Sequence, residues 1–233
     1  IQTVAGRYRG RIKMWDVVNE ALADADDEYL RDIEWNNILG EEFLVKAFQY
    51  AKEADPGALL IYNDYRCDHP GKLKKLVRLI KSVREQGGPI EALGLQAHYE
   101  YDKIPFEGIE TALSEMRKLG IKVVFSELDM DVTTRARWYY DGGKYRGEMK
   151  NWDPYPTVPQ NVLDEQARQY AKLFELIAKN SDVVERVTFW NLHDGQSWLN
   201  YWPWKRTNHP LLFDRQRKAK PALFSVLETL NSQ

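Results

Sequence analysis

The sequence predicts an α/β fold built on a parallel sheet and, within that class, a (β/α)8 TIM barrel. Short apolar runs alternate with amphipathic helical patterns five times along the 233 residues. Nearly all-apolar strands are typical of parallel sheets covered by helices on both faces. Polar or acidic residues follow each run, and a barrel would collect them at one mouth. No glycine-rich phosphate loop follows any run, which disfavours a doubly wound nucleotide-binding sheet.

The elements can be placed in order along the chain. Residues 1–9 carry apolar side chains at helical spacing before Gly10, so they predict the end of a helix. Gly87 and Gly120 lie where a glycine closes a helix. The strands are expected at residues 12–18, 58–62, 92–96, 122–126 and 186–190. The helices are expected at residues 41–54, 71–86, 106–119, 163–179 and 221–230.

A barrel needs eight strands, and this sequence supplies five. Because no strand precedes the first helix, we expect the chain to begin inside a domain. Residues 1–233 would be the C-terminal part of a single barrel, supplying about strands 4 to 8, with the first three βα units absent. Two sheet edges would then stay open. We therefore expect the chain to need the N-terminal part, as a separate segment or chain, for stability and activity.

Composition excludes several classes of function. The formal net charge of −2 argues against nucleic acid or an anionic membrane as partner. No apolar run is long enough for a membrane span, and the first residues do not form a signal peptide. The single cysteine, Cys67, cannot form an internal disulfide, and a cysteine-based metal site is disfavoured. Neither a metal nor a cofactor is expected.

Aromatic residues are unusually frequent, with 8 Trp and 13 Tyr, and they gather at residues 138–155 and 190–204. About half fit core packing. The others lie among polar residues, a setting that suits a ligand with apolar ring faces and many hydroxyls, such as a sugar. Residues 132–161 are also long for a βα loop, and such loops are usually functional or disordered.

Two glutamates occupy equivalent places in this pattern. Glu20 and Glu127 each end an apolar strand. Taken alone, either carboxylate fits a helix cap or an ion pair with a nearby arginine equally well. Taken together, they fit retaining glycoside hydrolysis, which needs two carboxyl groups about 5–5.5 Å apart, one protonated and one ionised.

Five motifs follow one another along the chain: WDVVNEAL (residues 15–22), YNDY (62–65), LGLQAH (93–98), FSELD (125–129) and FWNLHDGQSW (189–198). In this order they resemble the motifs of glycoside hydrolase family 10 endo-β-1,4-xylanases. The resemblance covers essentially the whole chain. It implies retaining hydrolysis of β-1,4-xylosidic linkages in xylan or xylo-oligosaccharides, without metal or cofactor.

The resemblance also assigns roles to residues. Glu20 matches the general acid/base, Glu127 matches the nucleophile, and His98 and Asp129 match a hydrogen-bonded chain that supports the nucleophile. Substrate-binding roles fall on polar and aromatic residues of the same motifs: Asn19 for the sugar 2-hydroxyl, Asn63, Gln96, Tyr65 on the leaving-group side, and Trp190 and Trp198 as walls that favour xylose.

The sequence departs from the family pattern at two places. Arg66 stands where YNDY usually continues with asparagine, and Asn191 replaces a glycine after Trp190. The family's first three strands, with their Glu-Asn pair, lysine, histidine and tryptophan, are absent.

Two other functions stay open. One is an inactive carbohydrate-binding fragment of the same fold, which the intact Glu20 and Glu127 disfavour. The other is a hydrolase of β-1,4-glucan, which the tryptophan walls disfavour less strongly. Because a xylan polymer cannot enter a cell, the protein is expected to be secreted, periplasmic or on the cell surface.

Overall fold

The computed structural model describes residues 1–133 and 152–232, and the chain divides into two compact units. The first unit comprises Ile1–Gln96, Glu107–Ser126 and Asp182–Val187, and the second comprises Ala97–Phe106, Glu127–Ser181 and Thr188–Gln233. The helices are α1 (Gln2–Arg7), α2 (Glu34–Leu39), α3 (Glu42–Ala54), α4 (Pro70–Glu85), α5 (Phe106–Leu119), α8 (Gln160–Lys179) and α9 (Pro221–Asn231). The strands are β1 (Met14–Asn19), β2 (Leu59–Asp64), β3 (Ala92–Leu95), β4 (His98–Glu100), β5 (Lys122–Asp131) and β6 (Val184–Phe189).

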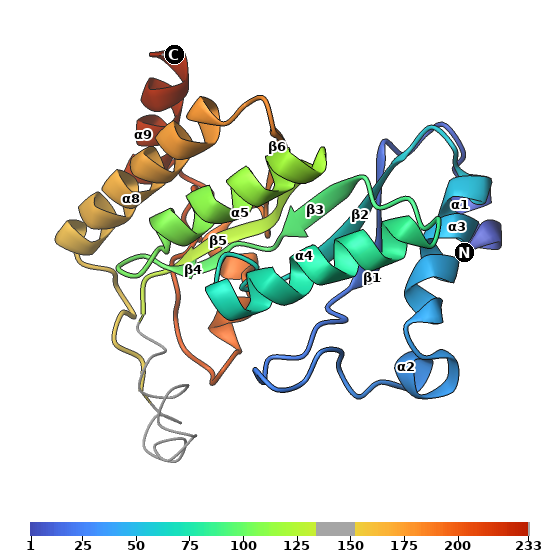
Figure 1. Ribbon diagram of the computed structural model, residues 1–233. Coiled ribbons are helices and arrows are strands. Elements are labelled where there is room, and N and C mark those ends of the chain that lie inside the picture. Colours follow the sequence, from blue (N-terminus) through green and yellow to red (C-terminus); the bar gives the residue numbers. More distant parts are fainter. Residues whose placement is uncertain (134–151, 233) are drawn as a thin grey trace. The chain divides into compact units, whose positions relative to one another are not determined.

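A parallel sheet forms the centre of the first unit (Figure 1). β1 pairs with β2, β2 with β3, and β3 with the first residues of β5, all in parallel. The register aligns Asn19 with Asn63 and Asn63 with Gly94, so polar ends of neighbouring strands come side by side. Every residue of β3 is buried, as expected for a strand covered on both faces.

The longer helices of the first unit, α3, α4 and α5, each bury an apolar face. α4 buries Leu73, Leu76, Ile80 and Val83, which recur every three or four residues on one helical face. Gly87 and Gly120 have positive φ angles of 83° and 66°, which glycine adopts without the steric cost of a side chain. The expected C-terminal glycines are thus confirmed.

The second unit contains β4, the later residues of β5, and the helix pair α8 and α9, which pack against each other (Figure 1). β4 pairs in parallel with β5, and this register places His98 opposite Asp129. Two short 3₁₀ helices, Asp194–Gln196 and Trp198–Asn200, follow β6.

The five expected strands and the six expected helical segments all occur, with ends shifted by a few residues. Sequence patterns missed β4, which has only three residues, and α2, which buries none of its side chains. β5 continues to Asp131, beyond the expected end at residue 126, because Asp129 and Asp131 are buried with hydrogen-bond partners instead of ending the strand.

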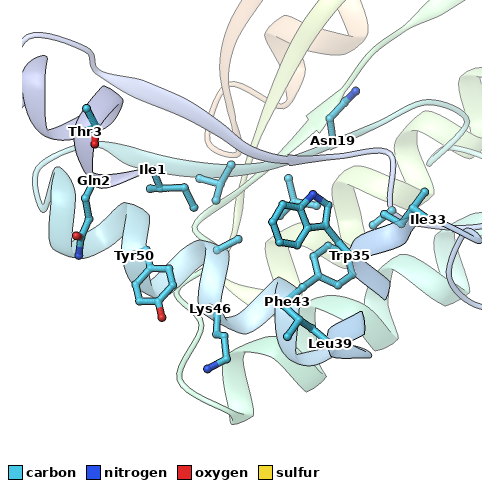
Figure 2. A pocket seen from close by; sticks show the side chains of 14 residues that line it. Ile1, Gln2, Thr3, Asn19, Ile33, Trp35, Leu39, Phe43, Lys46 and Tyr50 are labelled. Carbon is cyan, nitrogen blue, oxygen red and sulfur yellow. The ribbon is translucent and has the colours of Figure 1, made fainter. Parts of the chain in front are cut away.

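A largely apolar cavity of about 860 Å³ opens in the first unit between α1, β1, α2 and α3. Its lining includes Ile1, Trp35, Leu39, Phe43 and Tyr50, whose side chains surround the opening in Figure 2. The side chain of Trp35 is 64% exposed, which is unusual for so large an apolar group.

Within the parts of the chain that the structure describes, no helix combines the length and the apolar character needed to cross a membrane.

Candidate active site

Glu20 directly follows β1 and has a left-handed backbone, with a φ angle of 56°. Few non-glycine residues adopt this conformation, and strained residues of this kind cluster at functional sites. Its carboxylate has two partners: Arg31 Nη1 lies 2.9 Å from Oε2, and Gln96 Nε2 donates to Oε1 at 3.0 Å. About 29% of the Glu20 side chain is exposed, so a ligand can reach this carboxylate.

Amide side chains form a cluster beside Glu20. The Oδ1 atom of Asn19 accepts hydrogen bonds from Asn63 Nδ2 at 3.0 Å and from Gln96 Nε2 at 3.2 Å. Asn63 is buried, and its Oδ1 accepts a hydrogen bond of 2.6 Å from the Ser126 hydroxyl. These bonds fix the amide orientation of Asn19, the residue expected to bind the sugar 2-hydroxyl.

The parallel register explains how this cluster forms. Asn19, Asn63 and Gly94 are aligned on neighbouring strands. Since Gly94 has no side chain, that of Asn63 can lie over it: a Cβ atom there would meet Asn63 Oδ1 at 2.2 Å.

Tyr65 also belongs to this group. Its hydroxyl accepts a hydrogen bond from Arg31 and donates one to Asp24, and the Lys72 ammonium lies 3.7 Å from its ring centroid. The first unit thus brings together Asn19, Glu20, Asn63, Tyr65 and Gln96 from the expected site residues.

The second unit holds the other expected residues around one imidazole. His98 Nε2 lies 3.2 Å from Glu127 Oε2, and His98 Nδ1 lies 3.0 Å from Asp129 Oδ1. The strand register explains both contacts. His98 is opposite Asp129, and Glu127 is two residues earlier on β5, so the two carboxylates point to the same face.

The environment of His98 favours the imidazolium. Burial opposes the charge, but the carboxylates of Asp129 and Glu127 outweigh it and raise the pKa of His98 to about 9. In this form both ring nitrogens donate, one to each carboxylate. The imidazolium therefore places a positive charge within hydrogen-bond distance of Glu127, the residue expected to act as the nucleophile.

Tryptophans surround the same imidazole. Trp198 Nε1 donates to Asp129 Oδ2 at 2.7 Å, and the Trp198 and His98 ring centroids are 5.0 Å apart. Trp190 meets His98 edge to face at 6.4 Å and keeps 42% of its surface exposed. Trp202 stacks on Trp198 with centroids 4.8 Å apart. The second unit thus presents indole surfaces next to Glu127, which suits the apolar faces of a sugar.

Among residues 1–133 and 152–232, no group of three or more His, Cys, Asp or Glu side chains is arranged to hold a metal ion. The expected long loop at residues 132–161 falls mostly on residues 134–151, which lie outside the described residues.

The residues around Glu20 and those around His98 lie in a chain that is similar to a known family. The family model described as Glycosyl hydrolase family 10 matches residues 1–229, almost the entire chain. The chain belongs to glycosyl hydrolase family 10.

Curated family 10 relatives are similar along nearly the whole chain. An endo-1,4-beta-xylanase from Geobacillus stearothermophilus is 38% identical over 229 residues, covering 97% of this chain and 65% of that protein. A thermostable celloxylanase from Thermoclostridium stercorarium is 36% identical over 229 residues, covering 98% of this chain and 56% of that protein. The chain therefore spans less than two thirds of the length of these relatives.

Solved structures of the family agree with the fold. A GH10 endoxylanase retrieved from a sugarcane soil metagenome has a TM-score of 0.86 at 41% sequence identity. The match covers 97% of this chain and 65% of that chain. The parallel α/β sheet of this family 10 chain is thus consistent with a TIM barrel.

Both departures from the family 10 pattern lie on left-handed backbone. Arg66 has a φ angle of 56° and Asn191 one of 140°. Asparagine and glycine tolerate such angles better than most residues. The backbone conformation therefore fits the asparagine and the glycine that the family usually has at residues 66 and 191.

Sequence patterns missed several residues around Glu20: Asp24, Arg31, Tyr62, Asp64, Lys72 and Ser126. Tyr62 and Asp64 could have been identified from the sequence, because they belong to the YNDY motif. Arg31 lies in an irregular loop, and Lys72 lies on a helix rich in basic residues, so neither stands out from its neighbours in sequence.

Proposed function

We propose that this protein hydrolyses β-1,4-xylosidic linkages of xylan with retention of configuration, using Glu20 as general acid/base and Glu127 as nucleophile. The observation that carries the proposal is the contrast between the surroundings of the two carboxylates. The Glu127 side chain is 13% exposed and is hydrogen-bonded to the imidazolium of His98. The Glu20 side chain is 29% exposed and is held by Gln96 and Arg31, so it is the more accessible carboxylate for a departing oxygen and for water.

In the first step, Glu127 would attack the anomeric carbon while Glu20 protonates the departing glycosidic oxygen. In the second step, Glu20 would take a proton from water, which breaks the bond between Glu127 and the sugar. This chemistry requires the two carboxyl groups to be about 5–5.5 Å apart.

The remaining site residues would bind and orient the sugar. Asn19 would bind the 2-hydroxyl of the sugar at the cleaved linkage, held by Asn63 and Gln96. Tyr65 would contribute on the leaving-group side. Trp190 and Trp198 would form the wall beside Glu127 and His98, and a bulky wall excludes the hydroxymethyl group that glucose carries and xylose lacks.

We also propose that the five predicted strands correspond to strands 4 to 8 of a barrel and that activity requires an N-terminal part with the first three. The open cavity of Figure 2 and its exposed Trp35 support this requirement, because an apolar surface of this size is normally covered. The greater length of the family 10 relatives supports it too. Since xylan is a polymer, the site of action would be outside the cytoplasm, in secreted, periplasmic or surface-bound form.

The test uses the full-length protein, meaning the longest natural chain that contains these residues. Glu127→Ala should abolish turnover of an aryl β-xyloside, and added azide should restore turnover and yield the α-xylosyl azide. Glu20→Ala with azide should yield the β-azide, because Glu127 still forms the covalent intermediate. Glu28→Ala, which removes an exposed acid from the loop after Glu20, is the control and should retain full activity.

Failure of azide to restore turnover, or the β-azide from Glu127→Ala, would overturn the assignment of the nucleophile. Xylan and cellulose should be compared in the same assays, because one relative is described as a celloxylanase. A higher rate on cellulose would overturn the assignment of xylan as substrate.

A further inference from the structure

A ring of hydrogen bonds and ion pairs holds Glu20 at its carboxylate and through the backbone of the two residues that follow it. One arm begins at the carboxylate. Arg31 Nη1 contacts Glu20 Oε2 at 2.9 Å, Arg31 Nη2 donates to the Tyr65 hydroxyl, and this hydroxyl donates to Asp24 Oδ2. Lys72 ends this arm, with its Nζ 3.2 Å from Asp24 Oδ1.

The other arm begins at the backbone just after Glu20. The N–H groups of Ala21 and Leu22 both donate to the Tyr62 hydroxyl at 3.1 Å. That hydroxyl in turn donates to Asp64 Oδ2 at 2.7 Å. Lys72 Nζ lies 2.8 Å from Asp64 Oδ1, so the same ammonium group ends both arms.

The buried arm is suited to holding a strained backbone in place. Tyr62 and Asp64 are fully buried and the Lys72 side chain is 7% exposed, so water hardly competes for their bonds. Glu20 has a left-handed backbone, which persists only where the surroundings impose it. The two N–H groups bound by Tyr62 belong to the residues that complete this turn, so the Tyr62 hydroxyl fixes the direction in which Glu20 leaves β1.

We propose that Lys72, Asp64 and Tyr62 are positioning residues for general acid catalysis by Glu20, with Lys72 coupling the buried arm to the Arg31 arm. The inference rests on the proposed function, because it presumes that Glu20 protonates the leaving group. A misplacement of about 1 Å can cost on the order of 100-fold in rate. Loosening the ring should therefore impair protonation without removing the acid.

Substrates whose leaving groups differ in pKa distinguish a misplaced Glu20 from a loss of folded enzyme. Cleavage of xylotriose needs a proton on the departing sugar, whereas 2,4-dinitrophenolate departs without one. Loss of folded enzyme lowers kcat/KM for both substrates by the same factor. Misplacement of Glu20 lowers kcat/KM for xylotriose alone. The ratio of the two kcat/KM values therefore reports on Glu20.

In the full-length protein, we expect Tyr62→Phe and Lys72→Met each to lower kcat/KM for xylotriose by about 10- to 100-fold, a part of the roughly 10²- to 10⁴-fold that general acid catalysis supplies. For 2,4-dinitrophenyl β-xylobioside, kcat/KM should stay within about threefold of wild type on the same grounds. Lys75→Met is the matched control. Lys75 is also on α4 and also donates to the loop after Glu20, at the carbonyls of Ala23 and Ala25, but it lies outside the ring. Its ratio should equal that of wild type.

An unchanged ratio in Tyr62→Phe and Lys72→Met would overturn the inference, whether kcat/KM falls equally for both substrates or falls for neither. Tyr62→Phe removes a single oxygen atom, so it provides the test if Lys72→Met does not fold. Glu20→Ala run in parallel separates the two hypotheses: a normal ratio in this variant would overturn the proposed role of Glu20 itself. A strong loss confined to xylotriose in Glu20→Ala, with normal ratios in both ring variants, would leave the proposed function intact and overturn only the positioning role.

Discussion

At the scale of single residues, Gly94 provides the space on which the amide cluster beside Glu20 depends. Asn63 lies over this glycine, and its amide orients Asn19 while accepting a hydrogen bond from Ser126. A methyl group at residue 94 would also meet Ile61 Cγ2 at 3.0 Å, so the site offers little room for adjustment.

Gly94→Ala should therefore force Asn63 out of place and release Asn19. We expect kcat on xylan to fall about tenfold or more, and the free energy of unfolding to fall by about 1–3 kcal/mol through overpacking and lost hydrogen bonds. Steady-state kinetics and urea unfolding measure the two effects. Gly57→Ala is the control, because a Cβ atom there meets nothing within 4 Å. Wild-type kcat in Gly94→Ala would contradict the role of this contact.

A second single residue, His98, makes the stability of the protein depend on pH. Its folded pKa of about 9 lies above the ordinary value of 6.5, so folding favours the protonated form. The resulting stabilisation is complete below pH 6.5 and is lost as the pH rises through 9. From this difference the stabilisation is about 3 kcal/mol.

We expect the free energy of unfolding of the wild type to fall more steeply between pH 6 and pH 9.5 than that of His98→Gln, which keeps a polar side chain without the charge. Urea unfolding at several pH values measures the difference. Parallel curves for the two proteins would show that His98 is not held as an imidazolium.

At the scale of elements, the end of β5 depends on a fully buried ion pair. Arg206 Nη2 lies 2.7 Å from Asp131 Oδ2, and Asn208 donates to Asp131 Oδ1 at 2.6 Å. Arg206 Nε also donates to the Thr133 hydroxyl at 2.7 Å. The segment after Trp198 is thereby tied to the strand that carries Glu127.

Arg206→Ala would remove the guanidinium that pairs with the buried Asp131 carboxylate. We expect a loss of about 3–5 kcal/mol in the free energy of unfolding. Arg117→Ala breaks an exposed pair with Asp182 and should cost at most about 1 kcal/mol. Urea unfolding of both variants tests the contrast, and equal losses would contradict it.

The elements also show what a sequence pattern can predict. Apolar periodicity was sufficient for the long helices, whose buried residues recur on one face, and apolar runs were sufficient for every strand of the described chain except the three-residue β4. It could not predict α2, whose Trp35 and Ile38 are exposed and which buries none of its side chains in the described chain. Glu20 and Glu127 stood out because each follows an apolar run in the sequence. Arg31 and Lys72 did not, because long-range contacts and not local sequence bring them to Glu20.

At the scale of the whole molecule, each unit has an apolar surface of its own that is open to solvent. In the first unit it is the cavity next to Trp35. In the second unit it is a stripe on α9, where Phe224, Leu227 and Leu230 are about half exposed at helical spacing. Surfaces of this kind are normally covered by further chain or by a partner.

We expect the 233-residue chain on its own to aggregate and to hydrolyse xylan far more slowly than the full-length protein. Light scattering and rates per mole of enzyme test this expectation. Leu227→Ser should reduce aggregation of the isolated chain, while in the full-length protein it should lower the free energy of unfolding by about 2 kcal/mol or more, because the residue would there be buried. Full activity of the isolated chain would disprove the need for an N-terminal part.

Glu20 and Arg66 both have a left-handed backbone, and at Glu20 this sets catalytic activity against thermal stability. Each follows a strand, and each adopts a conformation that glycine would accept more readily. We expect Glu20→Gly to melt at a higher temperature than the wild type and yet to be inactive, whereas Arg66→Gly should become more robust while remaining active. Catalysis would then require the strained backbone at residue 20 to be kept. Residue 66 would be the better position at which to engineer a more heat-stable variant.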